Sequence, residues 1–191
     1  MKFHKCHERL PLRKRMVTQV VLSEEERSEL VSECELIREL SNWLHTLNRR
    51  PGLSEIDARL SNLNPNTEAI ERCIGYSQDG YQRNVISKNE NYELVAICWS
   101  PGQETPIHDH VGSDCAFLIV SGTCTETVFE ANEEDLAIPI LSREYKPGGI
   151  CAAEEADIHR ISNESNENLI NLHVYTPPLR DFKIYAPAES D

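Results

Sequence analysis

The sequence lacks any apolar run close to the roughly 20 residues that a membrane-spanning helix needs, so we expect no such span. Near its N-terminus it also lacks an apolar segment followed by a small-residue cleavage site, and we expect no secretory signal. Basic residues are few, with 19 against 32 acidic ones and a formal net charge of −13. A net acidic surface disfavours nucleic acid and anionic membranes, so neither is expected as a partner.

Paired cysteine motifs are also missing. The seven cysteines contain no C-x-x-C pair, and their number is odd. Several lie inside apolar runs, as Cys98 does between Ile97 and Trp99, where a free cysteine behaves as a small hydrophobic residue. The pattern indicates a protein with reduced thiols in the cytoplasm.

What the chain does contain fits one folded unit. It has 191 residues, 39% hydrophobic and 27% charged, which is the size and composition of a single globular domain. We expect an N-terminal arm over 1–22 and one catalytic domain over 23–191. Residues 1–15 carry six basic side chains and one acid, which is typical of a solvated arm, although a mitochondrial presequence is the alternative.

Residues 23–76 are predicted to be helical. Ser23 and Glu26 have the spacing of a capping box, and apolar residues then recur at helical spacing, so one helix is expected as far as Asn48. A shorter helix follows from Ser54 to before Pro65, and a third covers 67–74, with Gly75 ending it.

After Gly80 the pattern changes to short alternating runs separated by turn residues. Seven or more short strands after a helical start predict an α+β chain, mainly β, whose body over 81–186 is a barrel or sandwich. The predicted strands are 81–87, 92–100, 114–121, 123–130, 138–145, 157–162 and 168–176.

Within the β region, His108 and His110 are two residues apart. In an extended chain, side chains at i and i+2 point the same way, so both imidazoles can reach one ion, while Asp109 points to the other face. The flanking residues resemble the two metal-binding motifs of the cupins, which are double-stranded β-barrels with an internal metal. The residues that carry this resemblance are Gly102, His108, His110, Gly122, His159 and Asn163.

One departure from the cupin pattern is informative. The usual glutamate ligand would fall at position 114 or 115, where this chain has Asp114 and Cys115. Asp114 alternates away from Cys115 and is expected to miss the metal. Three neutral imidazoles then leave the ion its full charge and open positions, which suits an anionic thiolate ligand. Imidazole ligation alone would equally suit zinc, copper or nickel.

A set of further motifs occurs in order along the chain, and together they are similar to the cysteine dioxygenase family of thiol dioxygenases. The resemblance extends from about Tyr81 to Pro178. The motifs are Tyr81-Gln82-Arg83-Asn84, Cys98-Trp99, Pro106 to His110, Cys115, His159-Arg160 and Leu172 to Pro178.

The resemblance implies ferrous iron, Fe(2+), held by His108, His110 and His159. It implies that L-cysteine binds through its thiolate and amine and that O₂ places both atoms on sulfur, giving cysteine sulfinic acid. It also implies a cytoplasmic monomer that acts in cysteine catabolism and taurine biosynthesis.

The resemblance assigns Arg83 to the substrate carboxylate, because a guanidinium fork matches a carboxylate with two parallel hydrogen bonds. Tyr81 shares its strand face and would lie near the same pocket. Relatives that oxidise 3-mercaptopropionate carry glutamine at the position of Arg83, so this arginine favours cysteine as the substrate.

On the last predicted strand, His173 and Tyr175 alternate onto the face opposite Ile170, Leu172 and Val174. The resemblance makes Tyr175 a catalytic hydroxyl and His173 its support, with Trp99 packed beside them. Asn171 stands where vertebrate members have serine, and its amide is expected to be able to bond His173.

Cys115 and Tyr175 match the pair that forms a thioether crosslink in animal-type members of the family, and we predict that crosslink here. Many bacterial members have glycine at this cysteine position, so Cys115 favours an animal-type enzyme.

Two rival functions remain open at this point: a dioxygenase for another small thiol acid, such as 3-mercaptopropionate, and a non-catalytic cupin that senses or stores a metal or ligand. The segment after Pro178 does not match the familiar family continuation, so its contribution to closing the pocket is expected to differ.

Overall fold

The computed structural model describes residues 17–64, 67–154 and 156–188. Among these residues, no helix is long and apolar enough to cross a membrane. The helices are α1 (Glu24–Glu33), α2 (Glu35–Thr46), α3 (Leu53–Leu60) and α4 (Thr67–Cys73). The strands are β1 (Val17–Val21), β2 (Tyr81–Lys88), β3 (Glu93–Trp99), β4 (Asp114–Ser121), β5 (Cys124–Ala131), β6 (Ala137–Tyr145), β7 (Ile150–Ala153), β8 (Ile158–Ser162) and β9 (Leu169–Thr176).

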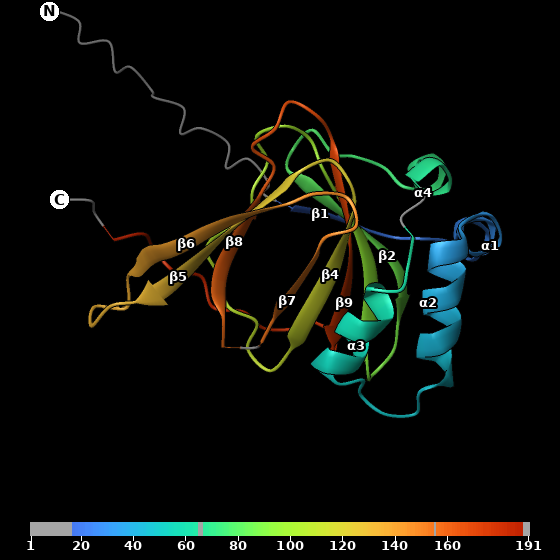
Figure 1. Ribbon diagram of the computed structural model, residues 1–191, viewed down its shortest axis with the longest axis horizontal. Coiled ribbons are helices and arrows are strands. Elements are labelled where there is room, and N and C mark those ends of the chain that lie inside the picture. Colours follow the sequence, from blue (N-terminus) through green and yellow to red (C-terminus); the bar gives the residue numbers. More distant parts are fainter. Residues whose placement is uncertain (1–16, 65–66, 155, 189–191) are drawn as a thin grey trace, which may run out of the picture.

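The strands form two sheets with the helices to one side (Figure 1). The larger sheet has the order β1-β2-β3-β9-β4-β7, and the smaller has the order β6-β5-β8. In Figure 1 the helices gather beside the larger sheet, away from the smaller one. The predicted α+β chain, mainly β with helices first, is therefore confirmed.

The two faces of β9 supply two separate cores. Ile170, Leu172 and Val174 pack with the helices in one buried cluster. Leu169 and Tyr175 belong to a second cluster, which includes residues from both sheets. The inward face of the larger sheet thus meets the smaller sheet, and the expected alternation along this strand is present in the structure.

The first predicted helix is wrong in one respect, because it is broken in two. Cys34 has an extended backbone, with φ −104° and ψ 105°, and separates α1 from α2. In one straight helix Leu36 would lie about 120° around the axis from Leu30. The break turns α2 so that Leu36 is buried along with Ile37, at 3% and 0% exposure.

The expected N-terminal arm is also corrected where the structure describes it. Val17–Val21 forms β1, which pairs in parallel with β2, with Val17 opposite Tyr81 and Gln19 opposite Arg83. Its β-branched residues suit a strand, but its partner lies some 60 residues further on. Residues 1–16 lie outside the described residues.

One strand is present that the sequence pattern does not reveal. β7 has four residues and pairs antiparallel with β4, with Cys151 opposite Phe117. A run this short is difficult to recognise by alternation. It places Cys151 against the interior of the barrel, where the residue is 3% exposed.

Candidate metal centre

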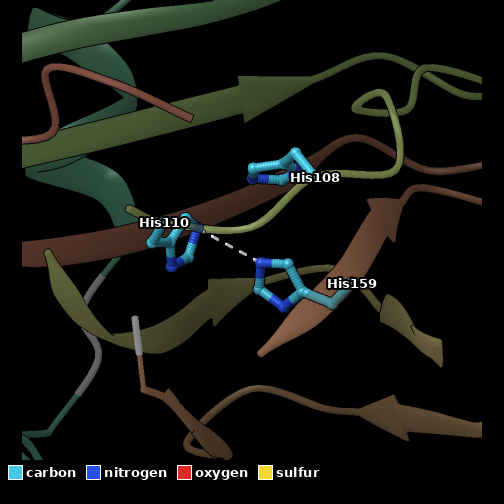
Figure 2. Close-up of side chains that lie close together, drawn as sticks. All are labelled: His108, His110 and His159. Carbon is cyan, nitrogen blue, oxygen red and sulfur yellow. Dashed lines mark hydrogen bonds between the residues drawn. The ribbon is translucent and has the colours of Figure 1, made fainter. Parts of the chain in front are cut away.

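Three imidazoles meet inside the barrel, as Figure 2 shows. His108, His110 and His159 are all buried, and one nitrogen from each lies within 4.8 Å of the others. The Nε2 atoms of His110 and His159 are 3.3 Å apart. Such a set of converging nitrogens is what a small divalent cation requires.

The first two histidines lie outside the named strands, in a segment that a backbone bridge at His108 joins to β8. His108 and His159 exchange both backbone hydrogen bonds across an antiparallel bridge, at 2.9 Å each. His108 and His110 therefore reach the same point from one side while β8 supplies His159 from the other. Asp109 points away, and its carboxylate accepts hydrogen bonds from Lys183 N–H at 2.8 Å and Tyr185 O–H at 2.9 Å.

Hydrogen bonds at the remote ring nitrogens leave Nε2 free on two of the ligands. His108 Nδ1 lies 2.9 Å from the carbonyl oxygen of Pro106, so that nitrogen carries the proton. His159 Nδ1 lies 2.9 Å from Glu126 Oε1, so this nitrogen also carries its ring's proton. His110 Nδ1 is buried and has no hydrogen-bond partner among the described residues.

The environment keeps His108 and His110 neutral. Burial, with a further contribution from His159, lowers the pKa of His108 to about 4. Burial and the neighbouring His159 and His108 lower the pKa of His110 to about 2. At neutral pH the lone pairs are available to a cation, so the residues present fit a bound metal.

The missing cupin carboxylate is not supplied by Asp114, which is not part of the cluster. Cys115 faces the barrel interior at 1% exposure. Glu126, which sequence reasoning missed, contacts the cluster through His159 Nδ1. The sequence does contain one sign that Glu126 is buried, because it lies two residues from Cys124 in a predicted strand and so shares its face.

A cavity of about 440 Å³ opens beside the three histidines. Tyr81 and Arg83 line it from β2, as the sequence predicts for a shared strand face. The guanidinium of Arg83 lies 3.2 Å from Glu93, a buried acid that sequence reasoning also missed, and 5.3 Å from the ring centroid of Tyr175. Its Nε is buried without a hydrogen-bond partner among the described residues.

Tyr175, His173 and Cys115 form the wall next to His110. The Tyr175 ring centroid lies 5.8 Å from that of His110 and 5.6 Å from that of His173. Cys115 is directly opposite Tyr175 in the pairing of β4 with β9, and its sulfur is 3.5 Å from His173 Nδ1. Burial, with a smaller effect of Arg83, lowers the pKa of His173 well below its ordinary value.

The expected bond between Asn171 and His173 is absent from the described contacts. Asn171 Oδ1 instead accepts a hydrogen bond from Trp99 Nε1 at 2.6 Å. Trp99 in turn stacks on Tyr81, with the ring centroids 4.4 Å apart. The Asn171 oxygen is therefore bonded to the indole, and this bond fixes the Trp99 wall of the cavity.

The segment after Pro178 closes another side of the cavity with Leu179, Phe182 and Ile184. The ring of Phe182 stands edge-on to His108 at 6.0 Å between centroids. Besides the two bonds to Asp109, the segment donates Tyr185 N–H to the carbonyl oxygen of Ile107 at 2.9 Å.

The remaining motif residues shape the loops around the site. Gly122 has φ +79°, and a Cβ there would lie 2.4 Å from the backbone oxygen of Asn168, so only glycine fits. The side-chain amide of Asn163 donates to the carbonyl oxygens of Trp99 at 3.2 Å and Glu167 at 2.8 Å. Asn163 thus holds the end of β8 to the end of β3.

Two sheets around a buried three-histidine cluster define a metal-binding cupin. A solved structure, an uncharacterized conserved protein with a double-stranded beta-helix domain from Klebsiella pneumoniae, superimposes with a TM-score of 0.51 and 21% identity. It covers 65% of this chain and 98% of that one, and it bears out the fold.

Sequence comparison identifies a particular family within this fold. Residues 29–188 match the family described as cysteine dioxygenase type I, and the chain belongs to that family. Cysteine dioxygenase type 1 of Rattus norvegicus is 29% identical over 164 residues, which cover 80% of this chain and 80% of the rat protein. The human protein of the same name is 31% identical over 112 residues, 54% of each chain.

Proposed function

We propose that this protein is a cysteine dioxygenase that converts L-cysteine and O₂ to cysteine sulfinic acid at one ferrous ion. The observation that carries the proposal is the cavity itself. Three imidazoles meet on one side of it, and the guanidinium of Arg83 and the hydroxyl of Tyr175 line the same space. A metal-bound thiol that also has a carboxylate matches this arrangement.

His108, His110 and His159 would hold the iron, and no carboxylate in the cluster would compete with an anionic thiolate. When bound, the iron supplies the reactivity toward dioxygen that side chains do not have. The protein contributes orientation, charge and exclusion of water. Phe182, Ile184 and Leu179 form the apolar side of the cavity that limits water.

Arg83 would bind the substrate carboxylate. Its ion pair with Glu93 fixes the guanidinium, and Glu93 is itself buried at 1% exposure. The buried Nε of Arg83 has no partner among the described residues, so the fork retains an unused donor. A carboxylate accepting two parallel bonds would fill that capacity.

Tyr175 would act as a proton donor in hydrogen bonds to the substrate. Burial, with the neighbouring Cys115 next in effect, raises the pKa of Tyr175 well above its ordinary value. The hydroxyl therefore keeps its proton throughout the neutral range. The neutral ring of His173, stacked beside it, supports the phenol without adding a positive charge.

The Cys115–Tyr175 thioether is part of the proposal. The two residues are cross-strand partners, so sulfur and ring lie on the same face of the sheet. Forming the C–S bond would remove the thiol hydrogen and one ring hydrogen, and O₂ would take up the two electrons and two protons to leave as hydrogen peroxide.

The test is metal content measured together with cysteine-dependent oxygen consumption. Iron-loaded protein is expected to consume one O₂ for each cysteine sulfinate formed, and protein stripped of iron to consume none. Iron-loaded protein that takes up no oxygen with cysteine would support the non-catalytic cupin instead.

Comparison of two thiols tests the substrate. The value of kcat/KM is expected to be higher for L-cysteine than for 3-mercaptopropionate. L-Cysteine would bind through both sulfur and nitrogen while its carboxylate meets Arg83, whereas 3-mercaptopropionate has no amine. A preference for 3-mercaptopropionate would refute cysteine as the substrate.

We also propose that the protein acts in the cytoplasm as a monomer. All six cysteines that lie in the described part of the chain are free, which agrees with a reducing compartment. Cysteine catabolism and taurine biosynthesis are the processes that would use the sulfinate product.

A further inference from the structure

Glu126 is a buried acid that touches the metal cluster from behind. It lies on β5 and is 4% exposed. Its Oε1 lies 2.9 Å from His159 Nδ1 and 3.1 Å from Cys151 Sγ. Its Oε2 accepts a hydrogen bond from the Tyr145 hydroxyl at 3.0 Å. One carboxylate thus receives three donors from three different strands.

These contacts determine what Glu126 can do. A carboxylate accepts hydrogen bonds and does not donate them, so His159 Nδ1 must carry the ring proton. The lone pair then lies on Nε2, which faces the Nε2 of His110. Because Cys151 and Tyr145 also bond the carboxylate, Glu126 cannot easily rotate to become a ligand itself.

The three ligands are supported unequally. Behind His108 there is a neutral carbonyl oxygen, from Pro106, and behind His110 there is no partner among the described residues. Within the described ranges, His159 alone among the three has an anion hydrogen-bonded behind it. A carboxylate behind a metal-bound imidazole makes that imidazole a more basic ligand and fixes its orientation.

We infer that Glu126 is a positioning residue that supplies, through His159, the negative charge that the ligand set lacks. The inference rests on the proposed metal centre. In the cupin pattern a glutamate binds the ion directly, whereas here Cys115 stands near that position and the carboxylate of Glu126 reaches the cluster through His159. The ion gains a nearby negative charge, and the positions for substrate remain open.

Metal affinity of the Glu126→Gln variant tests the inference without any turnover. Glutamine retains a carbonyl oxygen for His159 but removes the charge. The dissociation constants for Fe(II) and Co(II), measured anaerobically by competition with a chromophoric chelator, are expected to rise roughly 10- to 100-fold. The absorption spectrum of the Co(II) form is expected to shift, because the donor strength of His159 changes.

Glu130→Gln is the matched control, since Glu130 lies on the same strand but is exposed. It is expected to leave both dissociation constants unchanged. The Glu126→Leu variant removes charge and acceptor together, and it is expected to bind metal more weakly than Glu126→Gln. Circular dichroism and thermal unfolding establish that each variant is folded.

Unchanged metal affinity in folded Glu126→Gln protein would overturn the inference. If that variant does not fold, Tyr145→Phe provides the measurement, because it removes one bond that holds the carboxylate and is expected to weaken metal binding about threefold. No change in that variant would count against the inference equally. Failure of the proposed function is distinguishable, since it would show as normal iron binding without oxygen uptake.

Discussion

Arg83 has two roles, one in the cavity and one in stability, and a single substitution would change both. It faces the cavity, and it also neutralises Glu93, which is buried. Removing Arg83 alone leaves that acid with Lys88 at 3.5 Å as its remaining ion-pair partner. A buried charge that loses a partner destabilises the fold, so a single substitution would mix stability with substrate binding.

We therefore predict the behaviour of the Arg83→Gln/Glu93→Gln double variant. Loss of the charged fork is expected to lower kcat/KM for cysteine roughly 10- to 100-fold, mostly through KM, because charged hydrogen bonds contribute about 1.5–3 kcal/mol. Glu93→Gln alone is the control and is expected to retain most activity, because the amide oxygen can still accept a hydrogen bond from Arg83. Steady-state kinetics check this, and an unchanged KM in the double variant would contradict a role in carboxylate binding.

Cys115 provides a second prediction at the residue scale. Fully active, iron-loaded protein is expected to have an intact mass lower by two hydrogens than its sequence requires. Cys115→Ser is expected to have its full sequence mass and reduced activity, while Cys124→Ser, on the neighbouring sheet, retains the deficit. A fully active preparation without the deficit would rule out the crosslink.

Sequence alone predicts which individual residues carry chemistry when local spacing or a family motif marks them. His108 and His110 have strand spacing, and the alternation around Tyr175 separates the two cores. Glu126 and Glu93 could not be predicted, because their partners are distant in sequence or depend on burial. The contact from Glu126 to His159 spans 33 positions and depends on the pairing of β5 with β8.

At the scale of elements, the sequence again predicts what local pattern determines and misses what depends on distant contacts. Strands with clear alternation match the prediction closely, as β9 does. β1 and β7 were missed because pairing with distant strands, and not local pattern, makes them strands. The break at Cys34 was missed because apolar spacing on both sides of it is helical, and only packing against the sheet decides where the axis turns.

The role of the segment after Pro178 in holding the cavity wall can be tested directly. Tyr185→Phe removes its bond to Asp109, which lies between two metal ligands. The expected results are a loss of about 0.5–1.5 kcal/mol in the free energy of unfolding and a higher KM for cysteine with little change in kcat. Phe182 and Ile184, which this bond helps to hold, form the cavity wall.

Lys183→Gln is the matched control for that experiment. The ammonium of Lys183 pairs with Asp135 at the surface, and such exposed pairs contribute little. Urea unfolding and kinetics of both variants check the prediction. Equal effects of the two substitutions would mean that the bond to Asp109 has no special part in holding the wall.

At the scale of the whole molecule, buried neutral imidazoles make the metal-free protein sensitive to acid. The pKa values of His108 and His110 are lowered to about 4 and about 2, and that of His173 is also well below its ordinary value. In the unfolded chain these groups titrate near 6.5. Below that pH the unfolded state binds protons that the native state does not, so stability is present above about 6.5 and is lost as pH falls.

Each of these imidazoles is expected to contribute a slope of up to about 1.4 kcal/mol per pH unit below about pH 6. For His108 the loss is complete near its native pKa of about 4. Urea unfolding of metal-free protein between about pH 7 and pH 5 measures the slope. His173→Gln is expected to reduce it by about a third, and a pH-independent free energy of unfolding would contradict the buried neutral state.

Both outer segments of the described chain border one cavity. Val17 and Gln19 of β1 line it on one side, and Leu179, Phe182 and Ile184 line it on another. β1 is an edge strand with mostly exposed side chains, and Phe182 and Ile184 are 47% and 59% exposed. Segments held by few buried contacts open locally at low free-energy cost. Local opening of these exposed outer segments would give small molecules a route into the cavity, while the backbone bonds between His108 and His159 keep the candidate ligands in place.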